Sequence, residues 1–236
     1  MTASGRPPNQ LLRTLDAADF ALLEPHLATV DLVREMSLGA DGALPKQVYF
    51  PLRGAVSITV NLGEGQMIEV AMLGRDGVIG SGAALAGRTA LGNAVVLFPG
   101  AAAGLDCGAL RDIVNRSPNF RRLIVRHEQA LLAHAQQSVL CNTLHPVEAR
   151  LARWLLRARD LCDSATIPLT QELLAQRIGV RRNAISLVAH SLQRAGIIRY
   201  SRGQIEISDS DALEATCCAC YGAVKNVYRR LLQCGP

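Results

Sequence analysis

The chain has 236 residues, of which 49% are hydrophobic and 19% charged, with a formal net charge of +5 at pH 7. This balance is typical of a folded protein with sizeable cores and excludes an intrinsically disordered chain. No apolar run reaches the roughly 18 residues that a membrane helix needs, and the N-terminus MTASGRPPNQ lacks the apolar segment of an export signal, so we expect a cytoplasmic protein without a membrane partner.

The excess positive charge lies in the second part of the chain. Residues 1–145 contain 12 basic and 12 acidic residues, whereas residues 146–236 contain 13 basic and 8 acidic ones. Such an asymmetry is typical of a region that contacts the phosphates of a nucleic acid.

The first part of the chain predicts a short helix followed by many strands. The helix spans residues 11–27, and Asp16 can cap its second half. Beyond it, 14 of the 20 glycines lie between Gly39 and Gly108. Between the glycines are short β-branched runs at 48–50, 55–60, 67–73 and 94–98, with a Gly-Glu-Gly hairpin turn expected at 63–65. Many short strands with regular turn signals predict a small antiparallel barrel or roll.

A short helix at 105–115 and a long one at 119–142 follow the strands. The long helix contains no Gly or Pro, and three of its apolar residues are spaced by seven. This spacing predicts a seam against another helix. The seam would consist of Val125, Leu131, Leu132, Ala135 and Val139.

Two histidines and a proline complete this region. His127 and His134 are also seven apart, about 10.5 Å along a helix, so they cannot share a metal ion, and we predict them at the interface or in solvent. His145-Pro146 interrupts the helix and marks a domain boundary. The next helix, 147–161, carries arginines expected to point mostly outward, either to solvent or to a DNA backbone: Arg150, Arg153, Arg157 and Arg159.

Residues 169–207, after a predicted loop at 163–168, have the pattern of a DNA-recognition unit. Thr170 can cap a helix at 171–178, and Gly179 permits the tight turn to a second helix at about 181–195. Two short strands at 197–200 and 204–207 then form a wing around a polar turn.

The outward face of the second helix begins with basic residues and contains no acid of its own. Arg can donate two hydrogen bonds to guanine, and Asn can read adenine in the same way, and a recognition helix places its N-terminal residues against base edges. Leu187 either touches a thymine methyl or is simply exposed. The predicted DNA-binding residues are Thr170, Gln171, Arg181, Arg182, Asn183, Ser186, His190, Arg199, Tyr200 and Arg202.

The helix, glycine turn, Arg-Arg-Asn-headed helix and wing resemble the winged helix of the Crp/Fnr transcription regulators. Arg182 matches the first Arg of the family's recognition pattern, whereas Asn183 stands where Glu is common and Leu187 where a second Arg is common. Upstream, Arg53-Gly54-Ala55-Val56 resembles the Lys-Gly-x-Val of the family's β-roll.

The resemblance implies an α+β fold in three parts. These are a cyclic-nucleotide-binding-like antiparallel β-roll sensor at 1–118, a long dimerisation helix at 119–145 and a winged-helix domain with a helical tail at 146–236. It also implies a homodimer on a palindromic double-stranded DNA site, with RNA polymerase as a further candidate partner.

In nucleotide-binding relatives, a Gly-Glu pair holds the ribose and an Arg-Ser/Thr-Ala segment holds the cyclic phosphate. Here Gly80 is followed by Ser81 without an acid, and Arg88-Thr89-Ala90 comes a few positions early. Ser81, Arg88 and Thr89 are therefore candidates to bind a small anionic effector such as a cyclic nucleotide. The alternative is a divergent pocket in which Arg88 is only a surface residue, and the effector is left unidentified.

The tail predicts a helix over 209–232 that contains Cys217, Cys218 and Cys220. These thiols suggest a redox-responsive regulator as a second hypothesis. They do not predict a metal site, because on a regular helix they cannot face one point and no fourth ligand lies nearby in the sequence. The alternative is that they are small buried apolar residues.

No nucleophile elbow, phosphate-binding loop or zinc-protease motif occurs in the sequence, so we do not expect an enzyme. A third hypothesis is a ligand-binding or interaction protein in which the helix-turn-helix is only structural.

Overall fold

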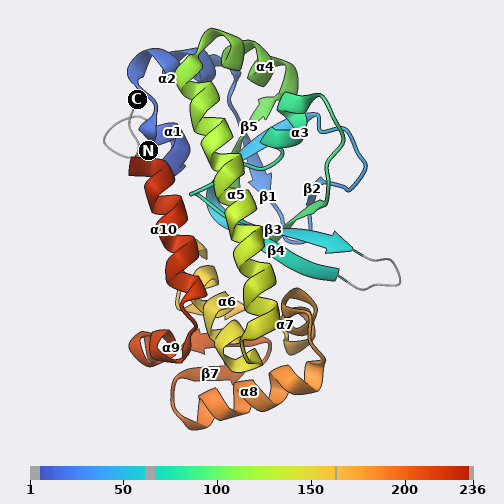
Figure 1. The fold of residues 1–236 in the computed structure, drawn as a ribbon, viewed down its shortest axis with the longest axis vertical. Coiled ribbons are helices and arrows are strands. Elements are labelled where there is room, and N and C mark those ends of the chain that lie inside the picture. The colour runs from blue at the N-terminus through green and yellow to red at the C-terminus, as the bar shows by residue number, and fades with distance from the viewer. Residues whose placement is uncertain (1–5, 62–66, 163, 234–236) are drawn as a thin grey trace.

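The computed structural model describes residues 6–61, 67–162 and 164–233 and shows a mixed α+β fold (Figure 1). The N-terminal helix predicted at 11–27 is divided into α1 (Gln10–Thr14), α2 (Ala17–Leu23) and a single 3-10 turn, η1 (Glu24–His26). Asp16 caps α2, as predicted, by accepting a hydrogen bond from the Asp19 amide.

An antiparallel sheet forms the upper half of the molecule. Its strands are β1 (Ala28–Leu32), β2 (Ser37–Gly39), β3 (Gln47–Asn61), β4 (Met67–Leu73) and β5 (Asn93–Asp106). The order is β1-β5-β3-β4, with β2 also paired to β5. The sheet agrees with the antiparallel prediction, whereas the hairpin turn expected at 63–65 lies outside the described residues.

The two strands predicted at 48–50 and 55–60 are one strand, β3, which bends at Gly54. Gly54 has a φ of +82°, and a Cβ there would lie 2.5 Å from the Phe98 carbonyl oxygen. Gly100 on β5 is equally tight, because its Cβ would lie 2.2 Å from the Arg53 carbonyl oxygen. The pairing register shifts at this point, so the two glycines allow the long strands to bend into a roll.

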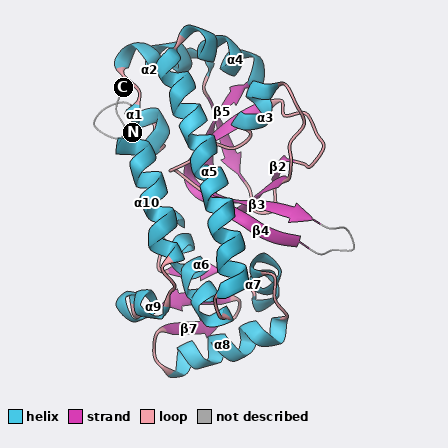
Figure 2. Ribbon diagram, in the orientation of Figure 1, coloured by secondary structure: helices cyan, strands magenta, loops and turns pink. Residues whose placement is uncertain are grey.

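Helices α3 (Ser81–Ala86) and α4 (Cys107–Arg116) lead to the long helix α5 (Pro118–Leu144). The C-terminal helix α10 (Cys220–Gln233) runs beside α5 for much of its length (Figure 2). Val224, Tyr228 and Leu231 of α10 are buried in the same core as the sheet. The end of the chain therefore packs against its beginning.

The prediction that His127 and His134 face an interface or solvent is wrong. Both are buried, because this side of α5 faces the sheet and α10 of the same chain. His127 Nε2 accepts a hydrogen bond from the Val78 amide at 3.2 Å. His134 Nδ1 lies 3.3 Å from the Tyr228 hydroxyl, and burial, together with Arg157 and Arg153, lowers the pKa of His134 well below its usual value.

The lower half of the molecule is the winged unit. It consists of α6 (Val147–Cys162), β6 (Thr166–Pro168), α7 (Gln171–Ile178), α8 (Arg182–Arg194), β7 (Ile198–Ser201), β8 (Gln204–Ile207) and α9 (Ser210–Thr216). The segment 166–168 was predicted as loop but pairs with β8 as a third strand. The single tail helix predicted at 209–232 is also wrong, because the chain leaves helical geometry after Thr216 and resumes it at Cys220.

The arginines of α6 do not form the outward basic face that was predicted. Arg150 is buried and donates to the Ile178 carbonyl. Arg157 donates to Asp76 at 2.6 Å and to the Met72 carbonyl at 2.8 Å. Arg150 thus bonds within the winged unit, whereas Arg157 joins that unit to the sheet, because Met72 of β4 and Asp76 in the loop after it supply buried acceptors. No helix within the described ranges combines the length and apolarity needed to cross a membrane.

Candidate nucleic-acid interface

The α7–α8 pair has the local geometry that the sequence predicts. Thr170 caps α7 by accepting a hydrogen bond from the Leu173 amide at 3.2 Å. Gly179 ends α7 with a φ of +71°, the left-handed geometry that favours glycine. Gln171 accepts a hydrogen bond from Ser186 Oγ at 2.6 Å, which fixes α8 against the start of α7.

The inner face of α8 is apolar, and its outer face is exposed. Ile185, Ala189 and Leu192 are buried in the core of the winged unit. Residues predicted to read DNA are exposed at the N-terminal end of α8 and two turns further on: Arg181, Arg182, Asn183 and His190. Ser186 is half-buried by its bond to Gln171, and Leu187 is 74% exposed. This end of α8 can therefore present hydrogen-bond donors to the edges of bases.

The recognition surface contains an acid that the α8 sequence alone does not reveal. Glu172 of α7 lies 3.9 Å from Arg182, and both side chains are more than half exposed. The wing repeats the arrangement, because Glu206 of β8 lies 3.6 Å from Arg199 of β7. Each carboxylate offsets the charge of an arginine that would otherwise be free to contact DNA.

The wing presents the other predicted contacts. Arg199 and Arg202 are exposed, and Arg202 has a φ of +49° in the turn between β7 and β8. Tyr200 is half-buried, and its amide donates to Gln193 at 3.0 Å. The turn therefore directs its arginine away from the core, where it can contact a phosphate.

The seam residues on α5 divide into two groups. Val125, Leu132 and Val139 are 47%, 60% and 65% exposed, and Leu140 and Leu144 extend this apolar stripe. Leu131 and Ala135 are half-buried, and Leu131 packs against the core of its own chain. Exposed apolar residues at heptad spacing are typical of a helix that pairs with another copy.

The start of α3, which corresponds to the ribose contact of nucleotide-binding relatives, lies against a carboxylate of α5. Glu128 accepts a hydrogen bond from the buried Ser81 hydroxyl at 2.5 Å, and a Cβ on Gly82 would lie 2.7 Å from its other oxygen. Burial alone would raise the pKa of Glu128, but hydrogen bonds from His127, Ser81 and the Gly82 backbone outweigh it and lower the pKa. Arg88 and Thr89 are exposed in the loop after α3.

A further polar cluster joins the winged unit to the sheet. Buried Glu69 of β4 accepts hydrogen bonds from Trp154 Nε1 at 2.8 Å and from Ser57 Oγ, which in turn accepts one from Arg177 at 3.2 Å. Burial raises the pKa of Glu69 even though these donors and Arg177 act in the opposite direction. The pattern of the sequence did not predict this cluster, because Glu69 is the single acid in an otherwise ordinary strand.

Two of the three tail cysteines lie beside the end of α5 and not along one continuous tail helix. Cys218 and Cys220 approach Cys141 and His145 of α5, and the four ligand atoms lie within 4.8 Å of one another. No further ligand lies near these thiols in the sequence, but the fold brings Cys141 and His145 to them from the end of α5, more than 70 residues earlier. Cys217 instead donates to the Cys218 carbonyl at 3.3 Å.

Comparisons with known proteins also identify a helix-turn-helix in the second part of the chain. Residues 149–216 match the Crp-like helix-turn-helix domain. A curated relative, the CRP-like cAMP-activated global transcriptional regulator of Mycobacterium tuberculosis, is 22% identical over 210 residues, covering 86% of this chain and 94% of that protein.

Two solved structures share the fold over most of both chains. FixK2 from Bradyrhizobium japonicum superposes with a TM-score of 0.69 at 17% identity, covering 82% of this chain and 98% of that one. A putative regulator of the crp/fnr family from Eubacterium rectale gives 0.68 at 17% identity, covering 87% and 96%. The chain therefore carries a Crp-like helix-turn-helix domain at residues 149–216 and has, over most of its length, the fold of Crp/Fnr transcription regulators.

Proposed function

We propose that the chain works as a homodimer that reads a roughly palindromic DNA site with the N-terminal end of α8. The observation that carries this proposal is the exposed Arg181-Arg182-Asn183 segment at that end, on a helix whose opposite face is buried. A two-fold dimer about the exposed stripe of α5 presents two such helices to successive turns of the major groove. The protein acts in the cytoplasm, where RNA polymerase is its second macromolecular partner.

Selection from random duplex DNA tests the proposal. We expect an enriched motif with two related half-sites, and Arg182→Ala should weaken binding to it by about 1–3 kcal/mol. Arg194→Ala is the matched control, because Arg194 is exposed on the same helix at its other end. Absence of any enriched motif would instead support the interaction-protein hypothesis, and equal losses for both variants would remove Arg182 from base recognition.

We also propose that the sensor is not controlled by a conventional cyclic nucleotide. The M. tuberculosis relative is described as cAMP-activated, but in this chain Glu128 already accepts hydrogen bonds at the start of α3. Ser81 stands where nucleotide-binding relatives carry the acid that holds the ribose, and it is already hydrogen-bonded to Glu128, so this position differs from their ribose contact. The effector of this chain is therefore of another chemical class.

Thermal melting with cyclic AMP, cyclic GMP and cyclic di-GMP checks this point. A ligand at 100 times its dissociation constant adds about 2.7 kcal/mol to the stability, which is about 5–10 °C for a chain of this size. We expect no such shift. The control is Arg53→Ala, which changes an exposed arginine on the otherwise mostly buried β3. The proposal would be contradicted by a melting shift that Arg88→Ala abolishes and Arg53→Ala leaves intact.

A further inference from the structure

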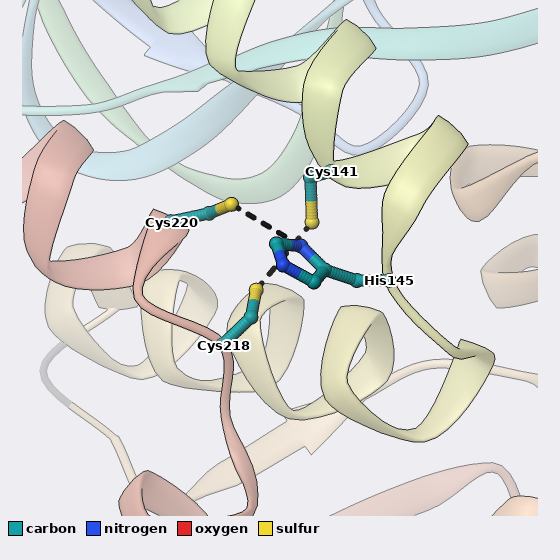
Figure 3. A group of neighbouring side chains, drawn as sticks. All are labelled: Cys141, His145, Cys218 and Cys220. Atoms are coloured by element: carbon teal, nitrogen blue, oxygen red, sulfur yellow. Dashed lines mark hydrogen bonds between the residues drawn. The ribbon is translucent and has the colours of Figure 1, made fainter.

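Four side chains with metal-binding atoms converge where the long helix ends. Cys141 and His145 come from the end of α5, and Cys218 and Cys220 from the segment between α9 and α10 (Figure 3). Cys141 Sγ lies 3.5 Å from Cys218 Sγ, and Cys220 Sγ lies 3.4 Å from His145 Nδ1. All four ligand atoms lie within 4.8 Å of one another.

Local geometry explains how each pair reaches the same point. Cys141 lies in the last turn of α5, and His145 is the C-cap that follows Leu144, with its amide bonded to the Cys141 carbonyl at 3.2 Å. Pro146 follows directly, and the residue before a proline is disfavoured in helical geometry. Cys218 lies in the non-helical break before α10, and Cys220 is the first residue of that helix. The break is what turns both thiols toward α5, since a continuous helix would place them on different sides.

The spacing matches a single ion rather than a cluster. A tetrahedral zinc site places two sulfurs about 3.8 Å apart and a sulfur and a nitrogen about 3.5 Å apart. The Cys141–Cys218 sulfur separation of 3.5 Å and the Cys220 Sγ to His145 Nδ1 separation of 3.4 Å are close to these values. An iron–sulfur cluster needs more room, because several irons and sulfides lie between its ligands. Three thiols and one imidazole form the Cys₃His set found in structural zinc sites, and soft thiolates favour zinc over magnesium or calcium.

The surroundings also suit a metal-bound thiolate. Gln137 of α5 donates a hydrogen bond to Cys220 Sγ at 3.0 Å, as groups around metal ligands commonly do. Three thiolates and one divalent cation carry a net charge of −1, so the cation offsets most of the charge of its ligands. Cys141 and Cys220 are buried, whereas His145 and Cys218 are half-buried and leave a route for the ion.

We propose that Cys141, His145, Cys218 and Cys220 bind one tetrahedrally coordinated thiophilic cation of the Zn²⁺ type. The ion ties the end of the long helix to the segment that follows the winged unit. It also lies next to His145-Pro146, where the chain passes from α5 to α6. Metal occupancy therefore sets the orientation of the winged unit relative to α5, and this last step rests on the proposed DNA-binding function.

Metal analysis of the purified, reduced full chain tests the site itself. We expect one zinc per chain, and Co²⁺ in its place should give the visible d–d and sulfur-to-cobalt bands of a tetrahedral thiolate site. Cys218→Ser should lose the metal and these bands. Cys217→Ser is the matched control, since it changes the neighbouring thiol that does not face the cluster, and it should bind metal as the parent does.

Three results would overturn the proposal. They are no zinc or cobalt binding by the parent chain, equal metal binding by the Cys217→Ser and Cys218→Ser variants, or a Cys141–Cys218 disulfide that persists in reducing buffer. Circular dichroism checks that each variant is folded. His145→Gln is a second ligand variant that leaves every thiol in place and should also lose the metal. DNA binding is measured separately. If metal binds but its removal leaves DNA affinity unchanged, the coupling fails while the site stands, whereas a parent that selects no DNA contradicts the proposed function alone.

Discussion

At the scale of single residues, the positive charge that Arg182 presents at the N-terminal end of α8 is partly offset by the carboxylate of Glu172. Their side chains are 3.9 Å apart and largely exposed, so their mutual attraction is weak and sensitive to salt. A DNA phosphate that approaches Arg182 also approaches the carboxylate of Glu172. The acid therefore reduces non-specific affinity and leaves more of the discrimination to base contacts.

We predict that Glu172→Gln raises affinity for unrelated duplex DNA by about 2–5-fold at low salt, because a surface pair of this type is worth at most about 1 kcal/mol. The gain should shrink as salt increases. Fluorescence anisotropy with a random duplex measures it. Glu24→Gln, an exposed acid in η1 at the far end of the molecule, should change nothing. An equal gain in both variants would show that only net charge matters.

Residue-scale features were predictable where the signal is local. Thr170 and Gly179 follow from capping and turn rules within a few positions. Arg150 and Arg157 do not, because an arginine on an amphipathic helix looks the same in sequence whether it faces water or a buried carboxylate. Cys141 and His145 were missed for a related reason, since only tertiary structure brings them to Cys218 and Cys220.

At the scale of elements, α5 has two distinct faces. One face contacts the sheet and α10 and buries His127 and His134, while the other carries the exposed apolar stripe from Val125 to Leu144. The heptad spacing of the sequence selected Val125, Leu132 and Val139, which are exposed, and their role as a seam between two copies stays a prediction. The spacing did not predict that Leu131 faces the core of its own chain, because α10 was not expected beside α5.

We predict that Leu132→Glu converts the proposed homodimer to a monomer. A buried leucine contributes about 1.5–3 kcal/mol, and the two-fold interface contains two copies, so the dissociation constant should rise at least about 100-fold. Sedimentation velocity measures the change. Leu91→Glu makes the same substitution at a side chain that is 92% exposed outside α5, and it should remain dimeric. A monomeric parent, or dissociation of both variants, would contradict an interface on this stripe.

The tail and the strands show where element prediction failed. The break at 217–219 contains no Gly or Pro, so it has no local signal. The break occurs because the chain changes direction after α9 so that α10 can pack against α5. Strand β6 has three residues, too few for a periodic pattern, and it exists because β8 offers it a partner. Both features depend on contacts between segments far apart in the sequence.

At the scale of the whole molecule, the two cores share segments. Val224, Tyr228 and Leu231 of α10 are buried with the sheet, while Ala55, Met72, Leu97 and Phe98 of the sheet are buried with the winged unit. Arg157 joins both regions, because it donates to Asp76 and its guanidinium lies 5.0 Å from the centre of the Tyr228 ring. Neither half can unfold without exposing apolar surface of the other.

We therefore predict a single cooperative unfolding transition in which Trp154 fluorescence and far-ultraviolet circular dichroism coincide. Trp154 is the only tryptophan, and it lies at the contact between the two halves through Glu69. Asp76→Ala leaves the buried Arg157 without its carboxylate and should cost about 3–5 kcal/mol. In the Asp76→Ala variant, the fluorescence transition should also come before the circular dichroism transition, because the contact between the halves near Trp154 breaks before the secondary structure unfolds. Asp31→Ala, at an exposed acid on β1, should preserve a single transition. Two transitions in the parent chain would mean that the halves are thermodynamically independent, and the orientation of the winged unit would then be set only by α5 and the His145-Pro146 connection to α6.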